Sequence, residues 1–327
     1  MKRVKFETLT DTVKDLQEQH KSFKFRAFGL IGILIIAVIA IIVKKYYVSF
    51  GLLVAAVAYH LFYLRPFEKQ YISNVNEANI LLTVGRFLGT EEVKNKGTEH
   101  LTRKELEEAQ LVPVLQREDG VSFYESVHGE YHGMKVTVSD VVISEDFKLK
   151  DNGTKGRNRV FQNCGCWTHI ELPKDTGYNF RLFEDNAVPT VMQQKFYEEQ
   201  NNLNKIPSGD VGLAGNYYLY VGSCDKAVGD TDEDNADNKN NAIEDETTLT
   251  KSEKMPPEKF IVRYEDLDKY TPGNTAVSVR GNVMDVYIRS RFLAMAVSTS
   301  AAPTEKSITF DPYPELKMIL ELAGILS

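Results

Sequence analysis

The hydrophobic pattern near the N-terminus is dominated by two apolar runs, Ala27–Val43 and Tyr46–Leu64, and neither run carries a formal charge. At about 1.5 Å of rise per helical residue, each run reaches most of the way across a hydrocarbon core roughly 30 Å thick. Both runs are apolar on every helical face, whereas a helix on the surface of a soluble domain shows a single apolar stripe, and the alternative to a membrane hairpin is a buried helical hairpin of a soluble protein. Only Lys44 and Lys45 separate them, and lipid excludes exposed irregular backbone. The pattern therefore predicts a transmembrane helical hairpin over residues 27–64.

Basic residues are distributed unevenly around this hairpin. Six lie near its outer ends and two lie in the connecting turn: Lys14, Lys21, Lys24, Arg26, Arg65 and Lys69, against Lys44 and Lys45. Positively charged residues favour the cytoplasmic side of a membrane. We therefore expect a two-span protein of the cell inner (plasma) membrane, with both termini in the cytoplasm.

Helical periodicity continues on both sides of the hairpin. Residues 1–26 are expected to form a cytoplasmic amphipathic helix, because apolar or aromatic positions recur at steps of three and four. These positions are Phe6, Leu9, Val13, Leu16, His20 and Phe23. Such a seam suits a partner helix, the membrane surface or the protein's own domain. Residues 65–110 have the pattern of a helical connector, in which Thr102–Glu105 matches a capping box.

From about residue 111 onward, the pattern changes to the period-two alternation of β-strands. Strands are expected at 122–127, 130–143, 161–172, 179–183, 217–221 and 292–297, with His132-Gly133 as a hairpin turn and Gly177 in the turn that joins 161–172 to its partner 179–183. Helices are expected at 189–199, at 275–289 and from Pro314 onward, an extended segment at 260–264, and a disordered acidic insertion at about 223–258. Residues 111–327 are therefore predicted to form one soluble α+β domain.

The predicted fold class is a membrane-anchored α+β protein, in which the hairpin precedes a cytoplasmic domain of mostly antiparallel sheet with a few helices. Charge agrees with this division. The chain of 327 residues has a net charge of −7, yet residues 1–70 hold 11 Lys or Arg and 5 Asp or Glu, against 28 and 41 in the rest. A basic membrane end suits an anionic lipid surface, and the acidic remainder argues against nucleic-acid binding.

The cysteines agree with a reducing compartment. Cys164 and Cys166 are two residues apart, and Cys224 is distant in sequence. A sparse, odd number of cysteines is not a disulfide framework, and it is typical of a cytoplasmic domain.

Several short motifs resemble a family of proteins. They are Gly129-Glu130-Tyr131-His132-Gly133, then Ser139-Asp140, then Phe161, Gly165 and Trp167, and finally Phe260, Tyr264 and Asp266. With the two spans, this layout resembles a family of bacterial two-span membrane proteins known only as a domain of unknown function. Asn163-Cys164 is extra material relative to that pattern. Some members of the family are encoded beside LemA-type membrane proteins, so the resemblance implies a possible LemA-type partner and no catalytic residues.

One candidate site is a metal site on the first predicted hairpin. His128, Glu130 and His132 alternate, so on a strand they would share one face, as two imidazoles and a carboxylate around a metal require. The alternative is a solvated strand face, with His132 in the turn itself. No helical His-Glu-x-x-His spacing supports the metal site.

A second candidate site uses sulfur. Cys164 and Cys166 share a strand face and could join Cys224 or His169 around zinc. The alternative is a pair of small buried thiols, because one Cys-x-Cys without a second close pair is a weak signal.

No catalytic motif is visible, so we expect no cofactor and regard an enzyme as the weaker hypothesis. The preferred function is a membrane-anchored cytoplasmic domain that acts as a binding or scaffold module for a protein or ligand at the inner membrane face. The first alternative is an enzyme with a site of sequence-distant residues, which could be metal-dependent. The second is an accessory subunit of an envelope or transport complex.

Overall fold

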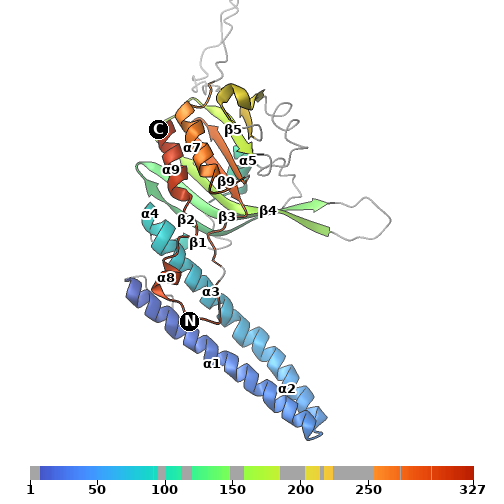
Figure 1. Cartoon of the computed structure of the whole chain (residues 1–327). Coiled ribbons are helices and arrows are strands. Elements are labelled where there is room, and N and C mark those ends of the chain that lie inside the picture. The colour runs from blue at the N-terminus through green and yellow to red at the C-terminus, as the bar shows by residue number, and fades with distance from the viewer. Residues whose placement is uncertain are drawn as a thin grey trace, which may run out of the picture. The chain divides into compact units, whose positions relative to one another are not determined.

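The computed structural model in Figure 1 divides the chain into two compact units. It describes residues 8–90, 92–94, 101–111, 120–147, 158–184, 203–213, 217–223, 254–272, 274–295 and 297–327, with backbone only at 144–147 and 158–163. The first unit comprises Met1–His100, Tyr124–Gly129 and Phe292–Pro314, and the second comprises Leu101–Phe123, Glu130–Arg291 and Glu315–Ser327. The helices and the mostly antiparallel sheet of the chain confirm an α+β fold with a long apolar helical region at the N-terminus.

Two long helices form the main body of the first unit. Helix α1 (Leu9–Ile42) begins at Thr8, whose hydroxyl accepts a bond from the Asp11 amide at 3.1 Å. After a tight turn, in which Lys44 adopts a φ of 59°, a second helical rod of 43 residues runs back beside α1 from Tyr46 to Leu88 (Figure 1). In order, this rod contains α2 (Tyr46–Tyr59), the π-helical turn η1 (His60–Leu64), α3 (Arg65–Ile80), the π-helical turn η2 (Leu81–Gly85) and α4 (Arg86–Leu88). The helix predicted after residue 65 is therefore continuous with the second apolar run.

The N-terminal seam packs within its own unit. Val13 and Leu16 of α1 lie in one cluster with Tyr71 and Val75 of α3, and Ile308 closes this cluster. His20 and Phe23 both stack on the ring of Tyr71. Of the three uses of the seam that the sequence left open, these contacts correspond to packing on the protein itself.

A late segment, Phe292–Pro314, returns to the two long helices. It contains the short helix α8 (Glu305–Ile308). The Asn79 amide donates to the carbonyl oxygens of Ile308 and Phe310, at 3.1 and 2.6 Å. From α1, Gln17 donates to the Pro303 carbonyl at 3.0 Å and His20 donates to the Thr299 carbonyl at 3.1 Å. Side chains of α1 and α3 therefore hold this segment by its main chain.

The same unit contains a short strand pair. Strand β1 (Val93–Lys94) pairs antiparallel with the middle of β2 (Gly120–Tyr131), with Val93 opposite Val127. Gly129 is required there, because a Cβ atom at this position would lie 2.3 Å from the Leu88 carbonyl oxygen. Strand β2 continues into β3 through His132 and Gly133, whose φ values are 50° and 80°. Positive φ at both positions is the pattern of a two-residue hairpin turn, which confirms the prediction.

The second unit is built on antiparallel strands in the order β3-β4-β9-β8-β5-β7-β6. Their bounds are β3 (Met134–Phe147), β4 (Asn158–Glu171), β5 (Asn179–Glu184), β6 (Asn204–Ile206), β7 (Tyr217–Val221), β8 (Thr275–Arg280) and β9 (Val283–Arg289). A 3₁₀ turn, η4 (Ser208–Val211), follows β6. Strands separated by more than 100 residues, such as β4 and β9, are therefore direct neighbours.

Helices cover both faces of this sheet. Helix α5 (Arg103–Ala109) begins with the predicted capping box, in which Thr102 and Glu105 exchange bonds. Its Leu106 and Ala109 join a core with Trp167 and Phe183. On the other face lie α7 (Glu258–Asp268) and α9 (Leu316–Leu326), and Phe260 of α7 meets Phe180 edge-on.

Four sequence predictions in this unit and its flanks were wrong. Residues 275–289 form the β8–β9 hairpin rather than a helix, because Gly281, at a φ of 57°, turns the chain between two alternating strands. Residues 260–264 belong to α7 rather than an extended segment. Residues 179–183 pair with β7 and β8, not with the strand before them. Residues 292–295 form no strand, since side-chain contacts such as Asn76 to the Met295 amide replace a ladder.

Three further predictions lie wholly or largely outside the described residues. They are the helix at 189–199, most of the acidic insertion at 223–258, and the position of Phe6 in the N-terminal seam. The strand at 217–221 is confirmed as β7, and the predicted C-terminal helix is present as α9.

We predict that Gly165→Ala destabilises the second unit by at least about 3 kcal/mol. The added Cβ atom would overlap a backbone atom of the neighbouring strand, which cannot move aside as a flexible side chain could. A Cβ atom there would lie 2.2 Å from the Ile288 carbonyl oxygen on the neighbouring strand. Unfolding is followed by the fluorescence of Trp167, the only tryptophan in the chain, which is fully buried in this unit. Gly324→Ala is the control, since its Cβ would meet nothing within 4 Å in α9. The control should stabilise by up to about 1 kcal/mol, and equal effects of both substitutions would contradict the prediction.

Candidate functional site

The three residues of the first candidate metal site are divided between the two units. His128 is half-buried on β2 in the first unit, whereas Glu130 and His132 belong to the second and are exposed. The His132 ring stacks on Tyr131 with a centroid distance of 4.2 Å. Across the part of the chain that the structure describes, no group of three or more His, Cys, Asp or Glu residues is placed to hold a metal ion.

The two cysteines of the second candidate site lie on one face of β4. Cys164 is half-buried and Cys166 is buried, and neither is in a disulfide bond. Burial raises the pKa of the Cys164 thiol and Asp140 raises it further, although Arg289 opposes this shift. A raised pKa disfavours the thiolate that metal binding and nucleophilic attack both require. Cys224 lies outside the described residues, and strand alternation places His169 on the opposite face from the cysteines.

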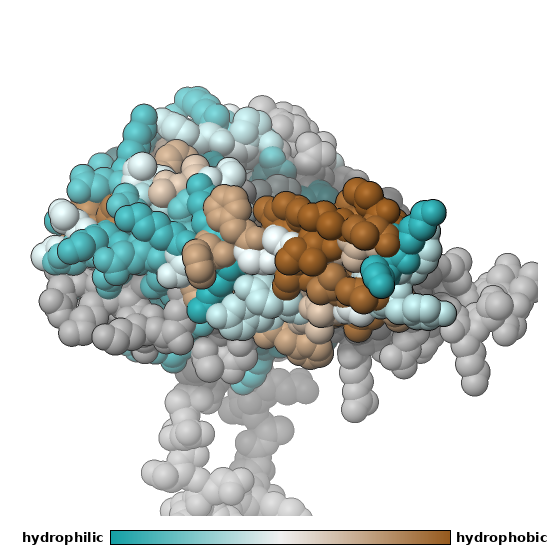
Figure 2. Space-filling view, turned by 90° about the horizontal axis from the view of Figure 1, so that it is seen from below, coloured by the Kyte–Doolittle hydropathy of each residue, from teal (hydrophilic) through white to brown (hydrophobic). Residues whose placement is uncertain are grey.

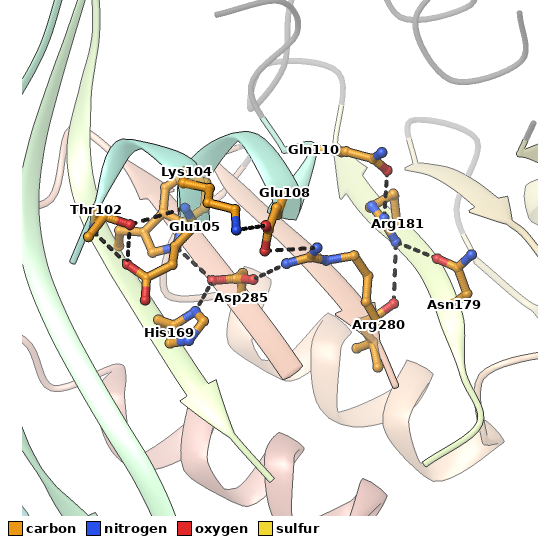
Figure 3. Close-up of polar contacts among 12 residues, drawn as sticks. Thr102, Lys104, Glu105, Glu108, Gln110, His169, Asn179, Arg181, Arg280 and Asp285 are labelled. Atoms are coloured by element: carbon orange, nitrogen blue, oxygen red, sulfur yellow. Dashed lines mark hydrogen bonds and ion pairs between the residues drawn. The ribbon is translucent and has the colours of Figure 1, made fainter. Parts of the chain in front are cut away.

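A polar cluster of the second unit is centred on Asp285 of β9, a carboxylate that is fully buried. Figure 3 shows the groups around it. One carboxylate oxygen accepts bonds from Trp167 Nε1 at 2.9 Å and from His169 Nδ1 at 2.8 Å. The other oxygen lies 3.5 Å from Arg280 Nη2. Trp167 and His169 alternate on β4, directly opposite Tyr287 and Asp285, so strand register alone brings the imidazole to the carboxylate.

The charge state of His169 is set by two opposing effects. Burial is the larger single effect and lowers its pKa, but the hydrogen bond and the charge of Asp285 raise the pKa, with smaller contributions from Glu105 and Glu171. The net result is a raised pKa, which favours imidazolium paired with aspartate. A buried carboxylate is costly unless it is paired and hydrogen-bonded. One oxygen of Asp285 accepts two hydrogen bonds, whereas the other forms an ion pair with Arg280 and accepts no hydrogen bond within the described residues.

Helix α5 is attached to the sheet by the same layer of polar groups. Glu108 lies 4.0 Å from Arg280, which also faces Asp285. Two residues further on, at the C-cap of α5, the Gln110 side chain accepts a bond from the buried Arg181 guanidinium at 2.6 Å (Figure 3). Arg181 also donates to Asn179 and to two backbone carbonyl groups, so its charge is solvated by neutral oxygens. These contacts hold α5 over β8 and β5.

This arrangement could hold or move a proton at His169. An imidazole whose Nδ1 is held by a carboxylate is the base–orienter pair of many hydrolytic sites, with Nε2 left for the reacting group. His169 is only 8% exposed, so little of its ring is open to a substrate. A concavity lined by Val262, Arg263 and Ile325 lies on α7 and α9, on the opposite face of the sheet. The concavity and the His–Asp pair therefore do not form one site.

Sequence reasoning missed Asp285, Arg280 and Arg181. Two signals could have found the first two: a single aspartate inside the apolar run 283–288, and the Gly281-Asn282 dipeptide that separates two alternating segments. Arg181 also interrupts a strand of aromatic and apolar residues. A charged residue in such a strand is informative because it must find a partner when buried.

No family model, curated protein or solved structure matches this chain. The resemblance to the two-span family therefore stays a prediction.

We predict that Asp285→Asn lowers the free energy of unfolding by about 3 kcal/mol or more, the cost of breaking a buried ion pair. It should also reverse the pH dependence that His169 contributes. In the wild type, the raised pKa adds stability that is fully present below the unfolded value of about 6.5 and is lost as pH rises through the folded pKa. Without the aspartate charge, burial is the largest remaining effect on the His169 pKa, and it lowers this pKa. The stability that His169 contributes should then grow as pH rises.

The measurement is the unfolding free energy from Trp167 fluorescence between about pH 5 and pH 8, the range in which histidine titrates. Asp266→Asn is the matched control, because the same chemical change then falls on an exposed ion pair with Lys269. The control should leave the slope unchanged. A wild-type slope in Asp285→Asn would mean that this carboxylate does not set the His169 pKa.

Proposed function

We propose that this chain is a bacterial inner-membrane protein whose two-span hairpin anchors a cytoplasmic α+β binding or scaffold module. The observation that carries the proposal is the exposure of the hairpin. Within the most apolar 18-residue windows of the two long helices, only 6% and 17% of residues are buried. A core helix of a soluble protein would be mostly buried, so this difference favours a lipid-facing surface.

The exposed side chains are large and lie on both helices. Phe25 on α1 is 81% exposed, Tyr47 at the start of α2 is 97% exposed, and Phe62 in η1 is 82% exposed. Figure 2 shows the apolar surface that such residues form. Monomeric soluble proteins rarely expose a contiguous apolar patch of more than a few hundred Å². Lipid is the partner that fits an apolar surface surrounding a helix pair.

A binding role is favoured over catalysis by the distribution of polar groups in the second unit. Its buried charges, above all Asp285 and Arg181, are paired within the fold rather than directed into a cleft. Anchoring confines the module to two dimensions, which raises the effective concentration of any membrane partner without new contacts. The resemblance above suggests a LemA-type membrane protein as that partner, and the acidic composition after residue 70 disfavours nucleic acid.

A second candidate function is an enzyme that uses sequence-distant residues, and the His169–Asp285 pair favours it. The two residues are 116 positions apart and lie 2.8 Å apart at Nδ1 and Oδ1. In an enzyme of this kind, His169→Gln would abolish turnover while leaving membrane attachment unchanged. Stoichiometric zinc or iron in the purified full chain would support the metal-dependent form of this function.

The anchoring is tested by placing charge in the middle of both spans. We predict that the double variant Ile35→Arg and Val57→Arg fails to remain in the membrane pellet, because each arginine costs about 2.5–3.5 kcal/mol at the centre of a span. Both positions are exposed, at 55% and 58%, so the substitutions disturb little of the packing within the protein. The measurement is the fraction of the chain that resists alkaline extraction from membranes.

The matched control is Ala302→Arg, which adds the same side chain at an exposed position in the segment after β9. This control should stay fully in the pellet. A wild-type chain recovered in the supernatant would contradict the anchoring. A tag at Ser327 that reacts with impermeant reagents outside intact cells would contradict the orientation.

A further inference from the structure

We propose that the inner end of the hairpin binds the phosphate of an anionic phospholipid through the guanidinium of Arg26. This inference rests on the proposed insertion of the hairpin in a bilayer and adds a ligand and a residue to it. The binding site lies wholly within the first unit, on α1, η1 and the start of α3.

Arg26 is held in place by aromatic rings of the second helical rod. Its guanidinium carbon lies 4.5 Å from the ring centre of Tyr63 and 3.9 Å from that of Phe67. Tyr59 adds a hydrogen bond to the Arg26 carbonyl at 3.2 Å. Stacking on rings orients a guanidinium but leaves its N–H groups, which lie in its own plane, to bind an acceptor.

The N–H groups of this guanidinium have no acceptor among the described residues, since no hydrogen bond or ion pair joins it to that part of the chain. By contrast, the buried Arg181 donates hydrogen bonds to oxygen atoms of Gln110, Asn179, Phe180 and Val279. A guanidinium that is oriented but unpaired is suited to the two-point recognition of phosphate.

Further cations surround Arg26 on the same helices. Lys21 and Lys24 lie one turn apart on α1, and Arg65 and Lys69 lie one turn apart on α3, and all four are exposed. None of these four forms an ion pair within the described residues. The carboxylates on the same turns are Glu18 and Glu68, so five cations stand against two anions. The local field therefore attracts an anion.

The position of Arg26 points to a lipid rather than to free phosphate. Arg26 directly precedes the first apolar run, and Tyr63 lies near the end of the second. Arginine and tyrosine at the end of a span are expected at the level of the headgroups. Phe25 and Phe28 beside Arg26 are 81% and 66% exposed. Acyl chains would cover these rings when the headgroup phosphate reaches the guanidinium, whereas free phosphate would leave them in water.

The test uses the full chain in vesicles of phosphatidylcholine that contain a small fraction of spin-labelled phosphatidylglycerol or, in parallel, spin-labelled phosphatidylcholine. Electron paramagnetic resonance measures the share of each label immobilised on the protein. We expect phosphatidylglycerol to be preferred, and Arg26→Gln to reduce that preference about five-fold, the effect of about 1 kcal/mol for one cation near an anionic surface. Arg26→Lys keeps the charge but loses the two-point contact. Its preference for phosphatidylglycerol should therefore lie between that of the wild type and that of Arg26→Gln.

Lys306→Gln is the control, because it removes one exposed cation from α8 and should leave the preference unchanged. Equal preference in the wild type and Arg26→Gln, with both chains inserted, would overturn the lipid site alone. Failure of the wild type to insert in phosphatidylcholine vesicles would overturn both the anchoring and the site. Displacement of the labelled lipid by inorganic phosphate would mean that Arg26 and the cations around it bind free phosphate, and it would overturn the lipid assignment.

Discussion

The constraint on which the rest of this protein depends is the apolar surface that α1 and α2 leave uncovered. Side chains such as Ile42, 74% exposed, and Phe50, 71% exposed, cannot face water without a large cost. The chain supplies no cover for them among its described residues, so the environment must supply it. In the proposed membrane hairpin, the turn between the helices has to be short, and the charged residues have to lie beyond the ends of the two apolar runs. The first unit is consistent with this demand, because its packed core begins only where the apolar runs end.

In the second unit the corresponding constraint is a single buried carboxylate. Trp167, His169 and Arg280 lie around the buried carboxylate of Asp285, and these partners come from β4 and β8 on either side of β9. The cluster therefore joins three neighbouring strands, and Glu108 of α5 lies 4.0 Å from its Arg280. This role is sufficient to explain why the residues are there. A catalytic role for His169 requires an additional observation, which is turnover that depends on its imidazole.

Local signals in the sequence predicted local structure well. The capping box at Thr102, the turn at His132 and the long apolar helices are each encoded by a few neighbouring residues. Non-local pairing was not predictable in this way. The partner of His169 lies 116 residues away, and its strand was mistaken for a helix because Gly281-Asn282 was not recognised as a turn. Within the part of the chain that the structure describes, the candidate metal residues do not form a group of three ligands. Sharing a strand face does not determine which other strand lies beside it.

The contacts between the beginning and the end of the chain restrict how the hairpin can lie in a bilayer. Gln17 and His20 precede the first apolar run, and they bind the carbonyl groups of Pro303 and Thr299, which follow the second. Both partners of each bond must be on one side of the membrane, so the chain between them must cross it an even number of times. An arrangement in which only the first apolar run spans the membrane would separate these partners by the whole bilayer. With two candidate spans, the bonds thus require that both cross or that neither does, and the exposed apolar surface favours two crossings.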